Sequence, residues 1–279
     1  MNDFYGVHFD YASRSSREFG LLLCSAESTR FLSLCGEISG TSVFVKNTKK
    51  RIPTGDDYSE SPISFEIDII TEDQRCLTIS ECRQIEKWLF NRQRYNKLYI
   101  DEYDDCDGYT SEIIDSKIKR LFINCRFINP SYIEAFGGIC GYHVTIEADS
   151  GYWWQDAITK EFALNLTTQS ATKTFYVNVD SDIDDYIYPK VTITVGAVGG
   201  GISLINKTDD PSNNRKTKFT GISPNTTFTI NSQINYISQG LYTSFEDRNF
   251  PRLLDGSNMI YAKGNISTIT FEYNNRRFL

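Results

Sequence analysis

Hydrophobic and polar residues alternate along many short stretches of this chain, which is the pattern of half-buried β-strands. In "SFEIDIIT", Phe65, Ile67 and Ile69 alternate with polar neighbours, and "GYHVTIEAD" repeats the pattern later. Before "SFEIDIIT", the polar residues 46–61 follow the short strand-like stretch "TSVFV" and indicate a loop or a long hairpin arm. The first half of the chain is therefore predicted to be mainly β.

One segment, "LTISECRQIEKWLFNRQRY", has helical spacing instead. Thr78 is a suitable N-cap and Glu81 completes a capping box, while Leu77 and Cys82 are placed for a hydrophobic staple. A single helix packing on a sheet is predicted here. Its apolar stripe would consist of Ile79, Cys82, Ile85, Trp88 and Leu89.

The texture changes after residue 150 to short alternating segments separated by turns. Examples are "KTFYVNVD", "PKVTITVG", "NTTFTIN" and "ISTITFEYN". Such spacing predicts a second unit that is a β-sandwich. The turn "GAVGGG", 196–201, lacks the Lys-Ser/Thr of a phosphate loop, so we expect a hairpin there.

The run "NFPRLLDGSN", 249–258, is predicted to be structural. Phe250, Leu253 and Leu254 would pin a loop onto the core, Pro251 would prevent strand pairing, and the Asp-Gly-Ser-Asn end would turn the chain. Arg252 is either a ligand or phosphate contact or a surface arginine beside the turn, and the second interpretation is favoured.

Charge and cysteine content change along the chain in a way that indicates a domain boundary. Residues 1–150 hold 17 Lys+Arg against 24 Asp+Glu, so the whole formal charge of −7 lies there, and 12 of each follow. All seven cysteines precede residue 141 without a C-x-x-C pair, which indicates reduced, mostly buried thiols. We predict domains at 1–149 and 150–279. Whether the last strand returns to the first domain stays open.

Several function classes are disfavoured. The negative charge argues against a groove that binds nucleic acid. Because the chain has no apolar stretch of 18 residues, we expect no membrane insertion. Because it has no signal-like start, we expect synthesis in the cytoplasm. No nucleophile, zinc or phosphate motif occurs, and His8 and His143 are the only histidines. The acidic stretches 101–108 and 180–185 lack the ligand order of a calcium loop and are expected to be exposed loops. We assign no catalytic, cofactor-binding or metal-ligating residue and expect no enzyme.

Two segments carry a family resemblance: "GGICGYHVTIEADSGYWW", 137–154, and "FPRLLDGSNMIYAKG", 250–264. Together with the opening "FYGVHFDYASRSSREFG", the helix around Trp88 and the intervening strands, their order resembles the distal tail (Dit) proteins of long-tailed, siphovirus-like bacteriophages and of phage-tail-like bacteriocins. The chain departs from the usual family pattern at 148–152, where Cys and Pro are common.

The resemblance implies a mainly β fold. Its N-terminal part would be a β-sandwich-like domain with one helix and a long hairpin arm that forms a homohexameric ring, single or stacked. Its C-terminal part would be a galectin-like jelly-roll sandwich. Such a hub of the virion tail tip, assembled in the host bacterial cytoplasm, would join the tail tube protein to the tail-associated tip protein and the receptor-binding proteins, with DNA only passing through. The resemblance also implies a role in host adsorption, at most weak contact with host carbohydrate, and no cofactor.

Three groups of residues are expected to matter in such a hub. A polar arm between subunits would contain Lys46, Lys49, Lys50, Arg51, Asp56, Asp57 and Tyr58. An acidic or neutral channel wall would repel passing duplex DNA, and it could draw on Asp101, Glu102, Asp104, Asp105 and Asp107. Trp153 and Trp154 fall at the domain junction, where packing is favoured over stacking on a sugar.

An alternative hypothesis from another class is a soluble carbohydrate-binding module whose lectin-like C-terminal sandwich does the binding. A glycoside hydrolase is disfavoured because no pair of carboxylates can be placed across a cleft from the sequence.

Overall fold

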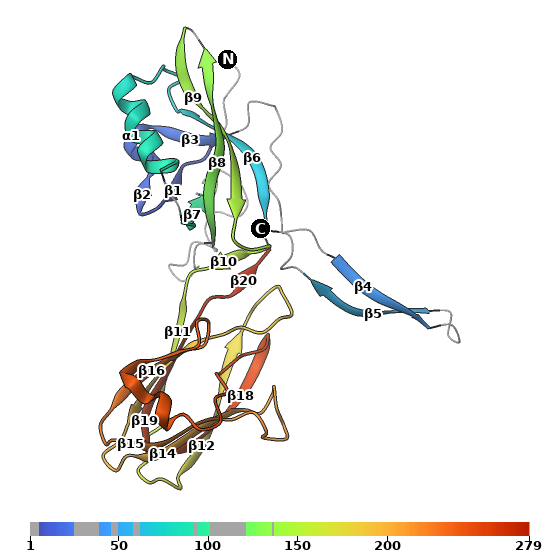
Figure 1. Ribbon diagram of the computed structural model, residues 1–279, viewed down its shortest axis with the longest axis vertical. Coiled ribbons are helices and arrows are strands. Elements are labelled where there is room, and N and C mark those ends of the chain that lie inside the picture. The colour runs from blue at the N-terminus through green and yellow to red at the C-terminus, as the bar shows by residue number, and fades with distance from the viewer. Residues whose placement is uncertain are drawn as a thin grey trace, which may run out of the picture. The chain divides into compact units, whose positions relative to one another are not determined.

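The computed structural model describes residues 6–24, 39–45, 50–57, 62–91, 94–100, 121–135 and 137–278. The chain forms two compact units (Figure 1). Unit 1 is Met1–Gln155 with Phe278–Leu279, and unit 2 is Asp156–Arg277. Antiparallel strands make up most of both units, and unit 1 contains the single α-helix of the described residues. The predicted mainly β fold with one helix is confirmed.

Unit 1 is built around one antiparallel sheet whose neighbours are often far apart in sequence. The fifteen-residue strand β8 lies at its centre, between β7 and β9. The order is β2 (Arg14–Ser15), β1 (Phe9–Tyr11), β7 (Asn96–Ile100), β8 (Leu121–Ala135), β9 (Gly138–Ala148), β6 (Ser64–Thr71) and β3 (Leu21–Cys24), with β10 (Trp153–Gln155) also paired to β8.

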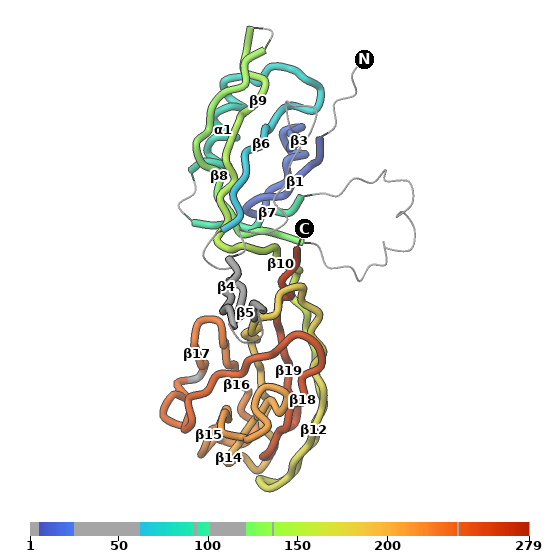
Figure 2. The backbone as a smooth tube through the Cα atoms, turned by 90° about the vertical axis from the view of Figure 1, so that its right-hand side faces the viewer, coloured from blue at the N-terminus to red at the C-terminus, as the bar shows by residue number. Residues whose placement is uncertain are grey.

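This sheet curls until its two ends meet. Val7, just before β1, and Leu23 in β3 exchange backbone hydrogen bonds of 2.9 and 2.8 Å. The 3-10 helix η1 (Ser16–Phe19) makes the connection from β2 to β3, and Gly20 ends it in the left-handed conformation (φ +59°) that glycine adopts without strain. The sheet of unit 1 is thus closed at the Val7–Leu23 seam, where Figure 2 shows β1 and β3 side by side. Buried residues of these strands and of the helix form one hydrophobic core.

The helix α1 (Ile79–Leu89) begins as the sequence predicts. The Thr78 hydroxyl accepts the Glu81 amide N–H, and the Glu81 carboxylate accepts the Thr78 N–H at 2.8 Å, which completes the capping box. Cys82, Ile85, Trp88 and Leu89 are buried against the sheet.

The prediction for Ile79 is wrong, because its side chain is 75% exposed. At about 100° per residue, Ile79 lies roughly 115° from the centre of the arc defined by the four buried residues, so it points off the sheet.

The hairpin arm predicted for unit 1 is present as strands β4 (Ser39–Val45) and β5 (Lys50–Asp57). The two strands pair antiparallel from Ser39↔Asp57 to Val45↔Lys50, with a register shift after Thr41. Among the described strands, neither pairs with a third. The hairpin therefore forms a sheet of its own.

Unit 2 is the predicted sandwich of two sheets over one core. Alternate residues of each strand point inward, as Val191, Ile193 and Val195 do in β13. The first sheet is β11 (Ile158–Ala163), β19 (Ile266–Tyr273), β13 (Lys190–Val195), β16 (Thr227–Asn231) and β17 (Tyr236–Ile237), followed by the 3-10 helix η2 (Ser238–Ser244). The second sheet is β12 (Thr172–Val179), β18 (Gly256–Gly264), β14 (Gly200–Asn206) and β15 (Thr217–Ile222).

The hairpin predicted at "GAVGGG" is wrong. The strands on either side, β13 and β14, belong to different sheets, so the turn carries the chain from one layer of the sandwich to the other. The buried Asn265 holds it: its side-chain oxygen accepts the N–H groups of Val198 (2.8 Å) and Gly199 (3.1 Å). Glycine is needed at Gly199, where φ is +68° and a Cβ would lie 2.6 Å from the Ile222 carbonyl oxygen.

The aspartates of the acidic stretch 180–185 are exposed, as expected, while Ile183 among them is buried. Their partners lie near the C-terminal end of the unit 2 sequence. Arg277 pairs with Asp180 (2.6 Å) and Asp182 (2.9 Å), and Arg276, in strand β20 (Arg276–Arg277), pairs with Asp185. The loop therefore fastens the C-terminal segment of the unit.

Candidate functional site

The groups that usually carry catalysis are not assembled for it in the described residues. No group of three His, Cys, Asp or Glu side chains there could hold a metal ion. His8 comes within 3.3 Å of Ser16 and 3.8 Å of Glu72, an arrangement that superficially suggests a nucleophile and its base. Ser16 is fully buried, however, and its oxygen accepts the Phe9 N–H at 2.9 Å, so it fixes the β2 turn and meets no substrate.

The second histidine is also a structural contact. His143 in β9 lies 2.7 Å from the Asp68 carboxylate on the neighbouring strand β6, at directly opposed positions of the ladder. Such cross-strand pairs stabilise a sheet. Within the described part of the chain, none of the helices is long and apolar enough to cross a bilayer.

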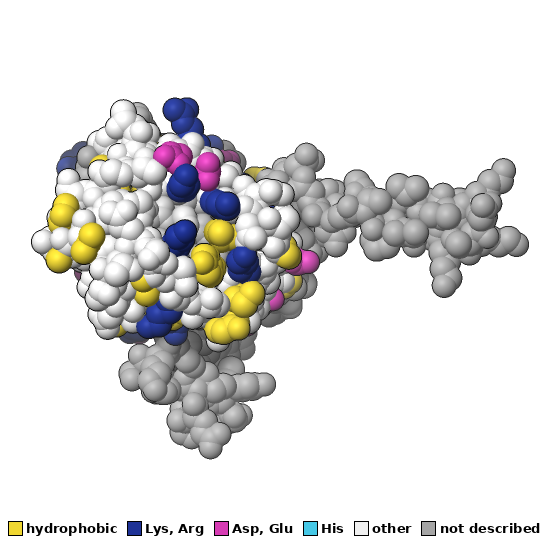
Figure 3. Space-filling view, turned by 90° about the horizontal axis from the view of Figure 1, so that it is seen from below, with side chains coloured by type: hydrophobic (Ala, Val, Ile, Leu, Met, Phe, Trp, Pro, Cys, Tyr) yellow, Lys and Arg dark blue, Asp and Glu magenta, His cyan; other side chains and the backbone are white. Residues whose placement is uncertain are grey.

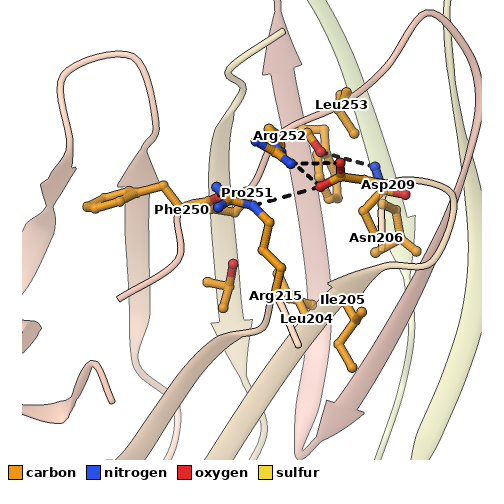
Figure 4. Close-up of a pocket in the computed structure, with 12 residues that line it drawn as sticks. Leu204, Ile205, Asn206, Asp209, Arg215, Phe250, Pro251, Arg252 and Leu253 are labelled. Carbon is orange, nitrogen blue, oxygen red and sulfur yellow. Dashed lines mark hydrogen bonds and ion pairs between the residues drawn. The ribbon is translucent and has the colours of Figure 1, made fainter. Parts of the chain in front are cut away.

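The segment 249–254 closes a small hollow at one end of the unit 2 sandwich (Figure 4). Asp209, whose side chain is 4% exposed, receives two hydrogen bonds from Arg252, Nε to Oδ2 at 2.8 Å and Nη2 to Oδ1 at 2.9 Å. Arg215 lies 3.7 Å from the same carboxylate and donates to the Phe250 carbonyl at 3.0 Å. Leu253, the next residue after Arg252, is fully buried. We call Asp209, Arg215 and Arg252 the arginine clamp.

The arginine clamp is a fastening and not a ligand site. Its hollow measures about 20 Å³, which is space for one water molecule at most. The hydrogen bonds from Arg252 to Asp209 raise the pKa of the guanidinium, and the Arg252 guanidinium also lies 3.6 Å from the centre of the Tyr186 ring. Of the two interpretations from the sequence, the favoured one, without a ligand, fits these contacts, but the side chain is partly buried (23% exposed). Arg252 ties the run 249–254 to the loop after β14.

Asn258 completes the fastening of this run, so the structural role of the run is confirmed. The turn predicted at residues 255–258 is wrong, because β18 already begins at Gly256 and pairs with β12 from there. The Asn258 side chain is fully buried; its oxygen accepts the Leu254 N–H (2.8 Å) and its nitrogen donates to the Leu254 carbonyl (2.7 Å). Leu253 also pairs with Ile187 through reciprocal backbone hydrogen bonds. Buried polar groups satisfied in this way fix one loop conformation.

The outward face of the second unit 2 sheet carries a basic hollow of about 660 Å³. Four lysines line it against one aspartate, Asp247. Figure 3 shows Lys and Arg side chains gathered around hydrophobic side chains on the face of the molecule seen from below. We call the outward residues of this sheet the lysine face; its lysines are Lys207, Lys216, Lys218 and Lys263.

The strand register explains how distant lysines meet on this face. Ser203 in β14 stands between Lys218 of β15 on one side and Lys263 of β18 on the other. Two positions along, Ile205 is opposite Tyr261. The intervening residues of these strands, such as Leu204 and Ile260, point into the core.

Sequence reasoning missed the lysine face. The four lysines span 57 positions without forming a charged run, since they occupy 207, 216, 218 and 263. Alternation within each strand was the available signal, because it places Lys218 and Lys263 outward. Only the strand order β18-β14-β15 brings them together.

The residues singled out from the sequence are found in different places. Lys50, Arg51, Asp56 and Asp57 lie in β5, where the backbone alone is described. Trp153 is 1% exposed and part of the core of unit 1, and Trp154 is half-buried with its ring 4.9 Å from that of Tyr152. Outside the described residues lie Lys46, Lys49, Tyr58, Asp101, Glu102, Asp104, Asp105 and Asp107.

Comparison with known proteins defines the class. Residues 4–150 match the family model described as phage tail protein N-terminal domain, and residues 154–273 match the one described as phage tail C-terminal domain. Together the two models cover nearly the whole chain. The protein belongs to this phage tail protein family, so it is a tail component. No curated protein sequence matches it.

Solved structures share the fold over nearly the full length. The Dit protein of phage SPP1 matches with a TM-score of 0.60 at 10% identity, covering 97% of this chain and 99% of that one. A chain of the phage p2 baseplate in its activated conformation with Sr matches with a TM-score of 0.53 at 12% identity, covering 98% and 99%. The fold is that of a distal tail protein, and the resemblance stated from the sequence is confirmed.

Proposed function

We propose that this protein is the hub of a distal tail: a homohexameric ring that joins the tail tube protein to the tail-associated tip protein and holds receptor-binding proteins. The observation that carries the proposal is the likeness over both units to the SPP1 Dit protein, which is described as a paradigm of the hub adsorption apparatus in phages infecting Gram-positive bacteria. A match confined to one unit would support only a shared domain. Here 97% of the chain is covered.

The ring is proposed to form through the N-terminal half, residues 1–149, with the β4–β5 hairpin as an arm between subunits. A two-stranded hairpin is at best marginally stable in water by itself. Since neither β4 nor β5 pairs with a third strand among those described, contact with a neighbouring subunit would supply the missing burial. Charged residues of β5, such as Lys50 and Asp57, would then help to set the register between copies.

The ring is further proposed to enclose a channel for DNA with a net negative wall. A basic wall would bind phosphates with release of counterions and retain the duplex, whereas carboxylates repel it. The formal charge of −7 arises entirely in residues 1–150, the half assigned to the ring. Acidic residues 101–107 are the proposed contributors.

The hub proposal is tested by the assembly state of the full-length protein. We expect light scattering coupled to size-exclusion chromatography to give a hexamer or a double hexamer, and negative-stain images to show rings with a central opening. A monomer that stays monomeric with its tail partners would contradict the proposal. If that monomer were also retained on a sugar column, the result would favour the alternative function, a carbohydrate-binding module.

Deleting residues 46–61 tests the arm. The shortened protein should fold, with an unchanged far-UV circular dichroism spectrum per residue, and run as a monomer because the contact between subunits is lost. A control deletion of Gln233 and Ile234, in the exposed turn between β16 and β17, should keep the ring. An unchanged oligomer after the 46–61 deletion would show that the arm is not the interface.

A further inference from the structure

We propose that the lysine face of unit 2 binds an anionic polymer in which phosphodiester groups join sugar or polyol units, of the kind represented by poly(glycerol phosphate). The proposed binding site lies on the surface of unit 2 alone, so binding does not require ring formation. It assigns a ligand to the 660 Å³ hollow on the outward side of β14, β15 and β18.

The first support is an excess of positive charge without internal partners. Lys218 is ion-paired with Glu246, and Lys207 donates to the Asn213 amide oxygen. Lys216 and Lys263, in contrast, have no carboxylate partner in the described part of the chain, and only Asp247 opposes them in the lining. Two ammonium groups held open in one hollow attract a ligand that carries more than one negative charge.

The second support is the spacing of the lysines. Lys218 and Lys263 flank β14 through its residue Ser203, so their backbones are two strand spacings apart, about 9.5 Å. Lys216 lies directly before β15 and Lys218 two positions later within it, so their backbones are at most about 7 Å apart. Anionic groups repeated along a flexible chain can meet several of these lysines at once, which a single phosphate cannot do.

The third support concerns the polymer backbone. The Tyr261 ring lies on the face, 5.5 Å from the Lys207 ammonium, and offers a flat surface for a sugar or polyol. Gln169, Ser203 and Asn213 add amide and hydroxyl groups for hydrogen bonds to hydroxyl-rich units.

An acidic peptide fits the hollow less well. The hollow lies on the face of a sheet whose β14 is paired on both sides, by β15 and β18, so an extended peptide would gain no ladder hydrogen bonds there.

The test measures binding of the full-length protein to poly(glycerol phosphate) of defined length by isothermal titration calorimetry at several salt concentrations. The double variant Lys216→Gln/Lys263→Gln should bind at least about tenfold more weakly at 50 mM salt. The slope of log K against log[salt] is negative, and its magnitude should decrease by about 1.4, since each lost contact with a single-chain polyanion contributes about 0.7. Tyr261→Leu should weaken binding severalfold and leave the slope unchanged, whereas Tyr261→Phe should bind like the wild type.

The matched control is Lys160→Gln, an exposed lysine on β11 of the other sheet, which should leave affinity within about twofold. Thermal unfolding confirms that each variant is folded. The proposal is overturned by undetectable binding of the wild type at 50 mM salt, or by equal affinity of the double variant. It is also overturned if poly-glutamate or single-stranded DNA of equal charge binds as tightly, because the site would then select charge and not the polymer.

Discussion

Unit 1 keeps its hydrogen-bonded Arg–carboxylate pairs near the surface, whereas unit 2 buries the side chain of one carboxylate almost completely. In unit 1, Arg75 pairs with Glu81 and Arg126 with Glu147, and both arginine side chains are about 40% exposed. In unit 2, Asp209 is 4% exposed under two arginines. Surface pairs contribute little, and breaking a buried pair is costly because it leaves an uncompensated charge. Losing one Arg–carboxylate pair should therefore cost unit 2 more stability than unit 1, although both units have aromatic cores.

The largest effect should come from Trp88→Ala, which removes the centre of the unit 1 core. Trp88 is 1% exposed, stacks on Phe9 with ring centres 5.7 Å apart, and donates its indole N–H to the Tyr11 carbonyl at 2.9 Å. We expect a loss of about 3–5 kcal/mol in the free energy of unfolding of unit 1, measured by urea titration. Ile79→Ala, on the exposed side of the same helix, should change it by less than about 0.5 kcal/mol. A loss below about 1 kcal/mol for Trp88→Ala would show that the core is held by other contacts.

The next effect should come from Asp209→Asn, which leaves Arg215 and Arg252 facing each other without a charge between them. Breaking a buried pair costs about 3–5 kcal/mol, and partial exposure of the Arg252 side chain, 23%, reduces our expectation to about 2–3 kcal/mol for unit 2. The control is Asp180→Asn, whose 84% exposed carboxylate pairs with Arg277 and should contribute less than about 1 kcal/mol. Equal losses for the two variants would remove the contrast between buried and surface pairs.

The smallest of these effects should depend on pH. Hydrogen bonds from Arg75 first, and then from Thr78, lower the pKa of Glu81 from 4.5 to about 2. A carboxyl whose pKa is lower in the folded state stabilises the fold above pH 4.5, and this contribution is lost as the pH falls toward 2. We expect about 1–2 kcal/mol for unit 1, measured as the difference in unfolding free energy between pH 6 and pH 2.5 for wild type and Glu81→Gln. Identical pH profiles would mean that Arg75 and Thr78 do not favour the ionised form.

The sequence predicted best what is decided locally. The capping box at Thr78 and Glu81 lies within four residues, and the alternation of each strand is set by its own side chains, so both could be predicted. The prediction that Ile79 is buried was wrong because helical spacing identifies a periodic residue but not where the buried side of the helix ends. The prediction of a hairpin at Gly199 was wrong for a related reason. Turn residues indicate that the chain reverses, but they do not indicate which sheet the next strand joins.

What could not be predicted depends on contacts between distant segments. Asp209 and Arg252 are 43 positions apart, and nothing in either neighbourhood indicates the other. Lys218 and Lys263 meet only through β14, so the lysine face requires the strand order. The family resemblance supplied the assembly hypothesis, which no spacing or composition could have provided.

The seam between Val7 and Leu23 has a consequence for the protein as a free subunit. An open sheet presents a row of unpaired N–H and C=O groups at each edge, where a second copy can add as another strand. Closing the sheet of unit 1 removes most of that exposed edge, leaving the two-residue β2. For the main sheet of unit 1, this closure limits strand-to-strand pairing between free copies, and among the described strands the β4–β5 hairpin keeps open edges.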